Sequence, residues 1–165
     1  PDREALRVLL TAAARTPDHG KLVPWRFVVV EGAARARLAA LARDRGAALG
    51  LAPEKIEKAA AAFGQGATLV AVIAAPQPSE KIPELEQILS AGCACLGLLN
   101  AALAAGWGAN WLTGFTATDR PFLEAAFGLA APAFVAGYLH IGAETATPPE
   151  RPRPELDAIT AWLDA

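Results

Sequence analysis

The segment most informative about the fold is residues 15–30, Arg15-Thr16-Pro17-Asp18-His19-Gly20-Lys21-Leu22-Val23-Pro24-Trp25-Arg26-Phe27-Val28-Val29-Val30. Its aromatic and β-branched end predicts a strand over residues 25–31. The part before the strand sets basic side chains and His19 beside a glycine, between two prolines. Pro17 ends the helix expected upstream. A basic loop that is fixed at both ends and leads into a strand suits an anionic, planar ligand.

Apolar runs and turn signals on either side of this loop predict an α+β domain. Asp2 can cap a first helix that runs to about Arg15. The uninterrupted apolar run from Thr68 to Ala75 predicts a central strand buried on both faces. We expect a sheet of about four strands with helices on both faces. The other expected strands are 108–112 and 134–142, and the other expected helices are 32–50, one opened by Pro53, 84–105, 119–127 and a short one ending at Ala165.

The composition fits one domain over residues 1–165, of which 146–165 form an extended arm and a short helix. With 53% apolar residues the chain is too hydrophobic to be disordered. Its 15 basic and 17 acidic residues leave a net charge of −2, which gives no electrostatic footprint for nucleic acid or an anionic membrane. Cys93 and Cys95 point to different sides of a helix, so neither a disulfide nor a metal pair is natural. We expect a reducing, cytoplasmic setting without a signal peptide.

One long stretch raises the question of a membrane. Residues 87–118 carry no formal charge, and a helix over 88–107 would be long enough to cross a bilayer. Serine, asparagine and several glycines interrupt the stretch, and no lysine or arginine flanks it as an anchor. A helix that is apolar on all sides can equally be buried within protein. The flanks favour that interpretation, so we expect no membrane span.

Several motifs of catalytic and nucleotide-binding sites are missing from the sequence. It contains no Gly-x-Gly-x-x-Gly, no phosphate loop and no Gly-x-Ser-x-Gly. Two histidines in distant segments cannot form a histidine-rich metal site, so we expect no bound metal. Any redox activity must then be carried by a cofactor. Arg15 alone suits a helix dipole and His19 alone suits a turn, so the ordered string, not either residue, points to a ligand.

Four segments together resemble the nitroreductase family, in particular its short single-domain NAD(P)H nitroreductases. The family pattern Ala-Pro-Asp-His-x-x-x-x-Pro-Trp-x-Phe stands here as Thr16-Pro17-Asp18-His19 through Pro24-Trp25-Arg26-Phe27. The likeness continues in residues 81–92, in Trp111-Leu112-Thr113-Gly114 and in residues 134–142. These anchors span nearly the whole chain in the expected order.

The resemblance implies a nitroreductase-like fold with FMN at a homodimer interface, and the long helix at the core of that interface. By the same resemblance, Arg15 and His19 would contact the flavin nucleotide. Trp111, Leu112 and Thr113 would line the isoalloxazine ring, and main-chain groups around Thr113-Gly114 would lie near its reactive N5 edge. A nicotinamide contact of the family falls near Ala101. The candidate cofactor-binding residues are Arg15, His19, Ala101, Trp111, Leu112, Thr113 and Gly114.

Two features depart from the family pattern. The family carries an Arg-Arg-Ser or similar motif upstream of the first helix, where it grips the flavin, and the sequence given holds none. Leu112 stands where some relatives have an arginine. The proline-rich tail resembles the arm that reaches over the partner subunit, where Arg151 or Arg153 would meet a phosphate. A solvated linker is the other interpretation of that tail.

The function implied is that of an FMN-dependent NAD(P)H oxidoreductase, with NADH or NADPH as donor and nitroaromatics or quinone-like molecules as acceptors. Two-electron ping-pong transfer would need no catalytic side chain, because flavin N5 carries the chemistry. The alternative is a non-catalytic flavin- or nucleotide-binding homodimer that has lost part of the flavin site.

Overall fold

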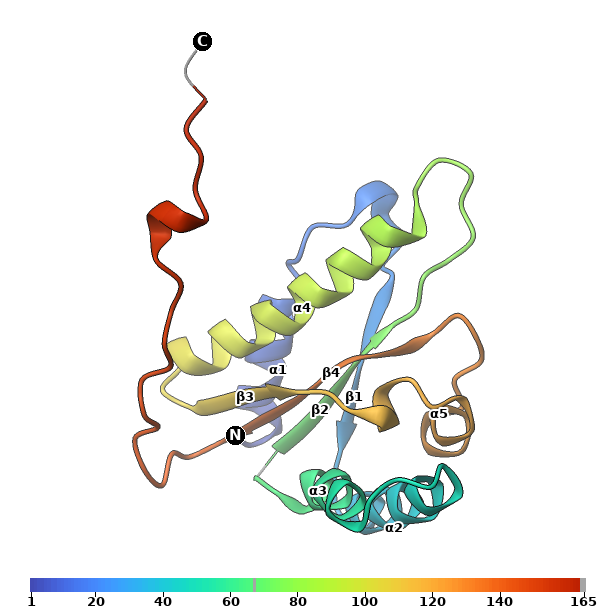
Figure 1. The fold of residues 1–165 in the computed structure, drawn as a ribbon. Helices are drawn as coiled ribbons and strands as arrows, with labels where there is room; N and C mark the ends of the chain where they lie inside the picture. The colour runs from blue at the N-terminus through green and yellow to red at the C-terminus, as the bar shows by residue number, and fades with distance from the viewer. Residues whose placement is uncertain (67, 164–165) are drawn as a thin grey trace.

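A four-stranded antiparallel sheet organises the chain, whose computed structural model describes residues 1–66 and 68–163 (Figure 1). The strands are β1 (Trp25–Val30), β2 (Thr68–Ala74), β3 (Gly108–Leu112) and β4 (Phe134–Gly142), in the order β1-β2-β4-β3. All seven residues of β2 are buried, which confirms the prediction of a central strand covered on both faces. The predicted α+β class is also confirmed.

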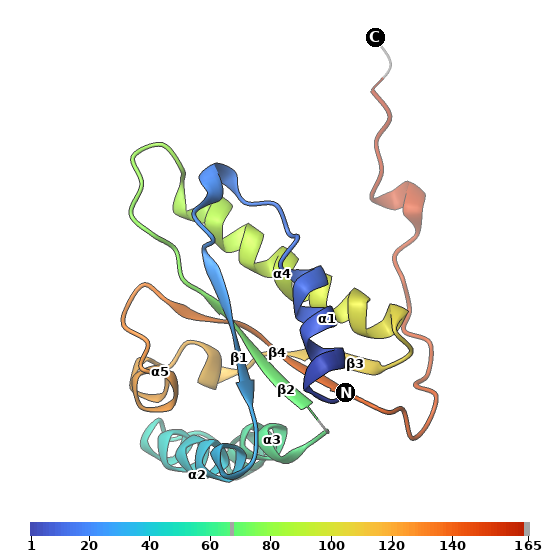
Figure 2. The same cartoon turned by 180° about the vertical axis from the view of Figure 1, so that it is seen from behind.

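Helices α1 (Arg3–Ala13) and α4 (Glu84–Ala104) cover one face of the sheet, and Figure 2 shows them side by side. The carboxylate of Asp2 accepts a hydrogen bond from the Ala5 N–H at 2.8 Å, so it caps α1 as expected. Burial of Leu6 and Leu9 fixes which side of α1 faces the core. The small residues on the inner side of α4 bring that helix close to the strands: Ala91, Ala94 and Ala102 are buried there.

The opposite face carries α2 (Ala33–Ala48), α3 (Pro53–Gly64) and α5 (Arg120–Phe127) (Figure 1). Asp119 caps α5 through the Phe122 N–H and also accepts two hydrogen bonds from Arg45 of α2, at 2.8 and 3.1 Å. The Arg45 guanidinium lowers the pKa of Asp119 by hydrogen bonding, and the paired charges tie α5 to α2. Gly128 closes α5 in the left-handed conformation. Helices on both faces were predicted, and the structure has them.

Helix α4 is buried on one side only within a single chain. It is long and apolar enough to cross a membrane by length and composition. Its inner side packs on the sheet, whereas four leucines of its outer side are exposed. These four, here called the α4 leucine stripe, are Leu85, Leu89, Leu96 and Leu103.

The C-terminal tail differs from the expected helix. Residues 143–163 contain no α-helix and no strand, only one 3-10 turn at Leu156–Ala158, and the tail leaves the body of the fold (Figure 1). The predicted short helix is present only as this 3-10 turn, residues 159–163 are not helical, and the last two residues lie outside those described. Four closely spaced prolines bias the chain before the turn toward extended backbone, and the tail's large apolar side chains find no core to pack against.

Candidate functional site

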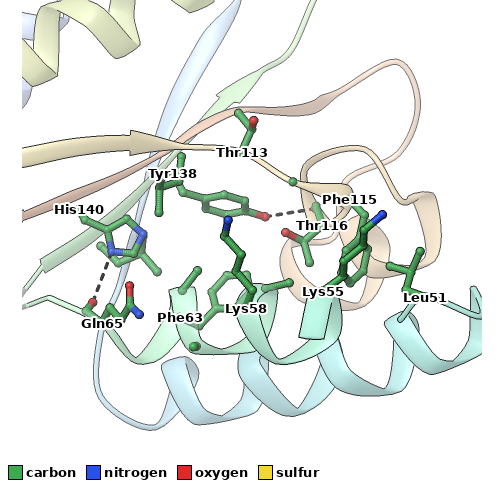
Figure 3. Close-up of a pocket in the computed structure, with 16 residues that line it drawn as sticks. Leu51, Lys55, Lys58, Phe63, Gln65, Thr113, Phe115, Thr116, Tyr138 and His140 are labelled. Carbon is green, nitrogen blue, oxygen red and sulfur yellow. Dashed lines mark hydrogen bonds between the residues drawn. The ribbon is translucent and has the colours of Figure 1, made fainter. Parts of the chain in front are cut away.

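A cavity of about 590 Å³ lies between α3 and the segment that follows β3 (Figure 3). Strand β3 pairs with β4 up to Leu112, opposite Tyr138, and the chain then leaves the sheet at Thr113. This departure opens the space that α3 covers from below in Figure 3. The lining residues are Leu51, Lys55, Lys58, Ala59, Ala61, Ala62, Phe63, Gln65, Leu69, Leu112, Thr113, Gly114, Phe115, Thr116, Tyr138 and His140.

Most of the cavity wall is apolar and aromatic. The Phe63 and Tyr138 rings meet edge to face with their centroids 5.4 Å apart. The Tyr138 hydroxyl donates to the Thr116 carbonyl at 3.2 Å. Burial raises the pKa of Tyr138 far above its ordinary value, so the phenol stays protonated and neutral. Such walls suit a flat, largely apolar ring system.

The polar groups of the cavity described next are main-chain N–H groups after β3 and lysine side chains on α3. Thr113 and Gly114 lie outside the β3 ladder, and no acceptor for their main-chain N–H groups is found among the described residues. A Cβ atom at Gly114 would meet nothing within 4 Å, so the backbone here is open to a ligand. Lys58 rises from α3 with its ammonium toward Tyr138, and Lys55 stands three residues earlier (Figure 3). None of the described lining residues is acidic, which leaves both lysines unopposed in the cavity.

His140 closes one end of the cavity as a neutral side chain. Its Nδ1 lies 3.4 Å from the Gln65 carbonyl oxygen, so Nδ1 is the protonated nitrogen. Its Nε2 is buried and has no partner among the described residues. Burial lowers the pKa of His140, the hydrogen bond to Gln65 partly opposes that shift, and the nearby Arg35 charge adds to it. Protonation of this ring is therefore disfavoured in the folded chain.

A second, more open hollow of about 530 Å³ lies on the other side of Thr113. The Trp111 indole lies against Gly137, where there is no space for a Cβ atom, and its Nε1 donates to the Ala136 carbonyl at 3.2 Å. The tail brings Arg151 to this hollow. Its lining residues are Leu99, Ala109, Asn110, Trp111, Thr113 and Arg151.

The loop between α1 and β1 is fastened to the start of α4 (Figure 1). His19 Nδ1 lies 2.8 Å from Glu86 Oε2, and both side chains are about half exposed. Arg15 is exposed at the end of α1. Four further hydrogen bonds fix the loop: Ser90 Oγ to the Pro17 carbonyl at 2.9 Å, Trp25 Nε1 to Ser90 Oγ at 3.1 Å, the Val23 N–H to Asp18 Oδ2 at 2.7 Å, and Gln77 Nε2 to the Leu22 carbonyl at 3.0 Å.

Comparison with known proteins identifies the fold and the family. The model of the nitroreductase family matches residues 1–143. The chain belongs to the nitroreductase family. The match ends before the extended tail, so the tail is the part of this nitroreductase-family chain that the family pattern does not cover.

Individual relatives agree with this assignment. An Escherichia coli (strain K12) protein named "Putative NAD(P)H nitroreductase YdjA" is 35% identical over 142 residues, which are 86% of this chain and 77% of that protein. A nitroreductase-like family protein of Bacillus cereus superposes with a TM-score of 0.80 over 100% of this chain and 87% of that one, at 20% identity. The FMN-dependent nitroreductase NfnB of Mycobacterium smegmatis, solved with NADPH, gives a TM-score of 0.73 over 98% and 88%, at 19% identity.

The seven residues predicted to bind cofactor fall into separate places in this nitroreductase-family chain. Leu112, Thr113 and Gly114 line the first cavity, and Trp111 lines the second hollow together with Thr113. Arg15, His19 and Ala101 line neither. Ala101 is half-buried on α4, two residues from Leu99 of the second hollow.

Sequence reasoning missed the wall that α3 and β4 provide. Lys55, Lys58, Tyr138 and His140 were not predicted as site residues, yet all four line the cavity. Two lysines three residues apart on a helix face ordinarily indicate a solvated surface, so their spacing did not indicate a binding site. The one available signal was a histidine and a tyrosine set two apart on an otherwise apolar strand, because such positions share one face of the sheet.

Proposed function

We propose that this chain is an FMN-dependent NAD(P)H oxidoreductase that reduces nitroaromatic or quinone-like acceptors. One observation carries the proposal: Leu112, Thr113 and Gly114, expected at the flavin ring, border an apolar cavity in a chain of the nitroreductase family. The names of relatives add support, since one is an NAD(P)H nitroreductase and another an FMN-dependent nitroreductase solved with NADPH.

The residues present fit a flavin ring. A volume of about 590 Å³ is within the range of sites that enclose small cofactors. Phe63, Leu112 and Tyr138 supply apolar contact for a planar ring, and the open backbone at Gly114 permits close approach. The N–H groups of Thr113 and Gly114, which have no acceptor among the described residues, would donate to acceptor atoms on one edge of an isoalloxazine.

When bound, FMN would accept a hydride from the nicotinamide and pass two electrons to the acceptor. The chain's own contribution is placement and electrostatics. The Thr113 and Gly114 N–H groups would orient the ring edge without changing protonation state. Lys55 and Lys58 would offset negative charge that develops on the ring, since no described lining residue is acidic. The hydrophobic wall would keep water from the reacting face.

A homodimer would complete the site. The α4 leucine stripe is an apolar face that a second copy of this helix can cover. Because Arg15 and His19 line neither hollow of their own chain, we infer that their loop serves the flavin of the partner subunit. Arg151, already at the second hollow, would be available to a phosphate.

An absorbance titration tests the function. Protein that carries its full N-terminus is mixed with FMN, freed of excess and treated with NADPH. A flavin band near about 450 nm that stays with the protein and bleaches supports the proposal. Protein that remains colourless at saturating FMN would contradict it.

A further inference from the structure

His19 is held at one ring nitrogen by a carboxylate of α4. Its Nδ1 lies 2.8 Å from Glu86 Oε2. A carboxylate only accepts hydrogen bonds, so Nδ1 carries the proton. In the neutral ring Nε2 then keeps its lone pair, and it has no hydrogen-bond partner among the described residues. The contact therefore selects one of the two tautomers and leaves the other nitrogen available.

The backbone around His19 is held in an unusual conformation. Lys21 and Val23 have φ values of 57° and 47°, in the left-handed region that side chains rarely adopt. For Val23, which is β-branched and exposed, the penalty is larger than for most residues. Such strain persists only where surrounding contacts over-determine it, and the four hydrogen bonds to this loop supply those contacts. The loop thus has one shape in which to present His19.

We propose that Glu86 is a positioning residue of the cofactor site, which holds His19 as the Nδ1–H tautomer so that Nε2 accepts a hydrogen bond from a ribityl hydroxyl or the ring N–H of the flavin nucleotide. This inference rests on the proposed function. In this proposal Glu86 acts through His19, whose Nδ1 its Oε2 contacts. Its place in the first turn of α4 also suits a negative charge, so the helix supports the carboxylate in the required position.

The tautomer can be measured without cofactor. The chain has only two histidines, so long-range ¹H–¹⁵N correlation spectra of the flavin-free protein contain two ring systems, and His19→Gln assigns them. Spectra are recorded at about pH 9, where an ordinary imidazole is neutral. The native protein should show protonated Nδ1 and unprotonated Nε2 for His19. Glu86→Ala should give a mixture of tautomers, whereas Glu86→Gln, whose amide oxygen still accepts, should restore the native pattern.

The second measurement is FMN affinity, read from the quenching of flavin fluorescence. Glu86→Ala should weaken binding by about threefold to tenfold, the effect of losing one ordinary hydrogen bond. In a His19→Ala background the same change should have no effect, because Glu86 acts only through the imidazole. Glu84→Ala is the matched control: it removes an exposed carboxylate from the same helical turn and should bind FMN within twofold of the native protein.

The outcomes separate the two proposals. Native protein that binds FMN while Glu86→Ala matches Glu84→Ala in affinity overturns the inference and leaves the proposed function standing. An unchanged His19 tautomer in Glu86→Ala does the same. Equal loss of affinity with and without the imidazole shows that Glu86 acts by another route and also overturns it. Failure of the native protein to bind FMN overturns the proposed function, and the ligand part of the inference with it.

Discussion

Gly137→Ala tests how the site is built, because it adds a single methyl group beneath Trp111. A Cβ atom at this position would lie 2.6 Å from Cδ1 and 2.9 Å from Cε2 of the indole, and closer still to Nε1. The added Cβ atom would be attached to the β4 backbone, which is held in the sheet, so the indole ring of Trp111 must move. The substitution therefore displaces the Trp111 side chain from β4.

The cost follows from what the indole loses. Its hydrogen bond to the Ala136 carbonyl contributes about 1 kcal/mol. Trp111 is only 36% exposed, and uncovering roughly 100 Å² of the ring costs about 2.5 kcal/mol at about 25 cal/mol/Å². Alanine is favoured over glycine in a strand by about 0.5–1 kcal/mol, which offsets part of this. We expect a net destabilisation of about 2–3 kcal/mol and a melting temperature lower by about 5–10 °C.

Urea unfolding and circular dichroism melting give the magnitude, and FMN affinity should fall because Trp111 lines the second hollow. The decisive control is Trp111→Ala, in which Gly137→Ala should cost nothing or stabilise slightly. Gly64→Ala, at the end of α3 where a Cβ atom meets nothing within 4 Å, controls for the added methyl group. A full loss of stability in the Trp111→Ala background would refute the steric argument.

Three further outcomes are expected. Because burial holds the pKa of His140 below its ordinary value of about 6.5, the unfolded chain takes up that proton first on acidification. The free energy of unfolding should fall as the pH drops below about 6.5, and His140→Phe should flatten this dependence in urea titrations at pH 8 and 5.5. Val23→Gly relieves a φ of 47° and should raise the free energy of unfolding by about 1 kcal/mol, unless the loop lacks this strain and the midpoint falls. Leu96→Asp in the α4 leucine stripe should give monomers in light scattering, whereas Val8→Asp on α1, where the side chain is also exposed, should not; a native protein that is already monomeric contradicts the dimer.

The fold was largely predictable because its main elements carry their own signals. The run from Thr68 to Ala74 is apolar after its first residue, and its length and β-branched content are typical of a strand covered on both faces. Asp2 and Asp119 mark the starts of α1 and α5, because an N-cap carboxylate accepts hydrogen bonds from free N–H groups of the first helical turn. Each of these signals lies within a few residues of the structure it predicts.

The cavity was harder to predict because no local signal describes it. Lys58 and Tyr138 lie 80 positions apart in the numbering and meet only because β3 ends opposite Tyr138 while α3 packs below. The loop with His19 shows a second limit of prediction from sequence. Its motif resembles a flavin-contacting segment of the family, but it does not indicate whether that segment would contact a ligand of its own chain or of a neighbouring subunit.

Thr113 forms a partition one residue thick, since it borders the first cavity on one side and the second hollow on the other. A change at this position alters the shape of two compartments at once and cannot be assigned to either. Residues that border a single compartment, such as Lys58 or Arg151, can vary independently. Under the proposed function, new acceptor preferences would therefore be reached more readily through the outer walls than through the residue that divides the two hollows.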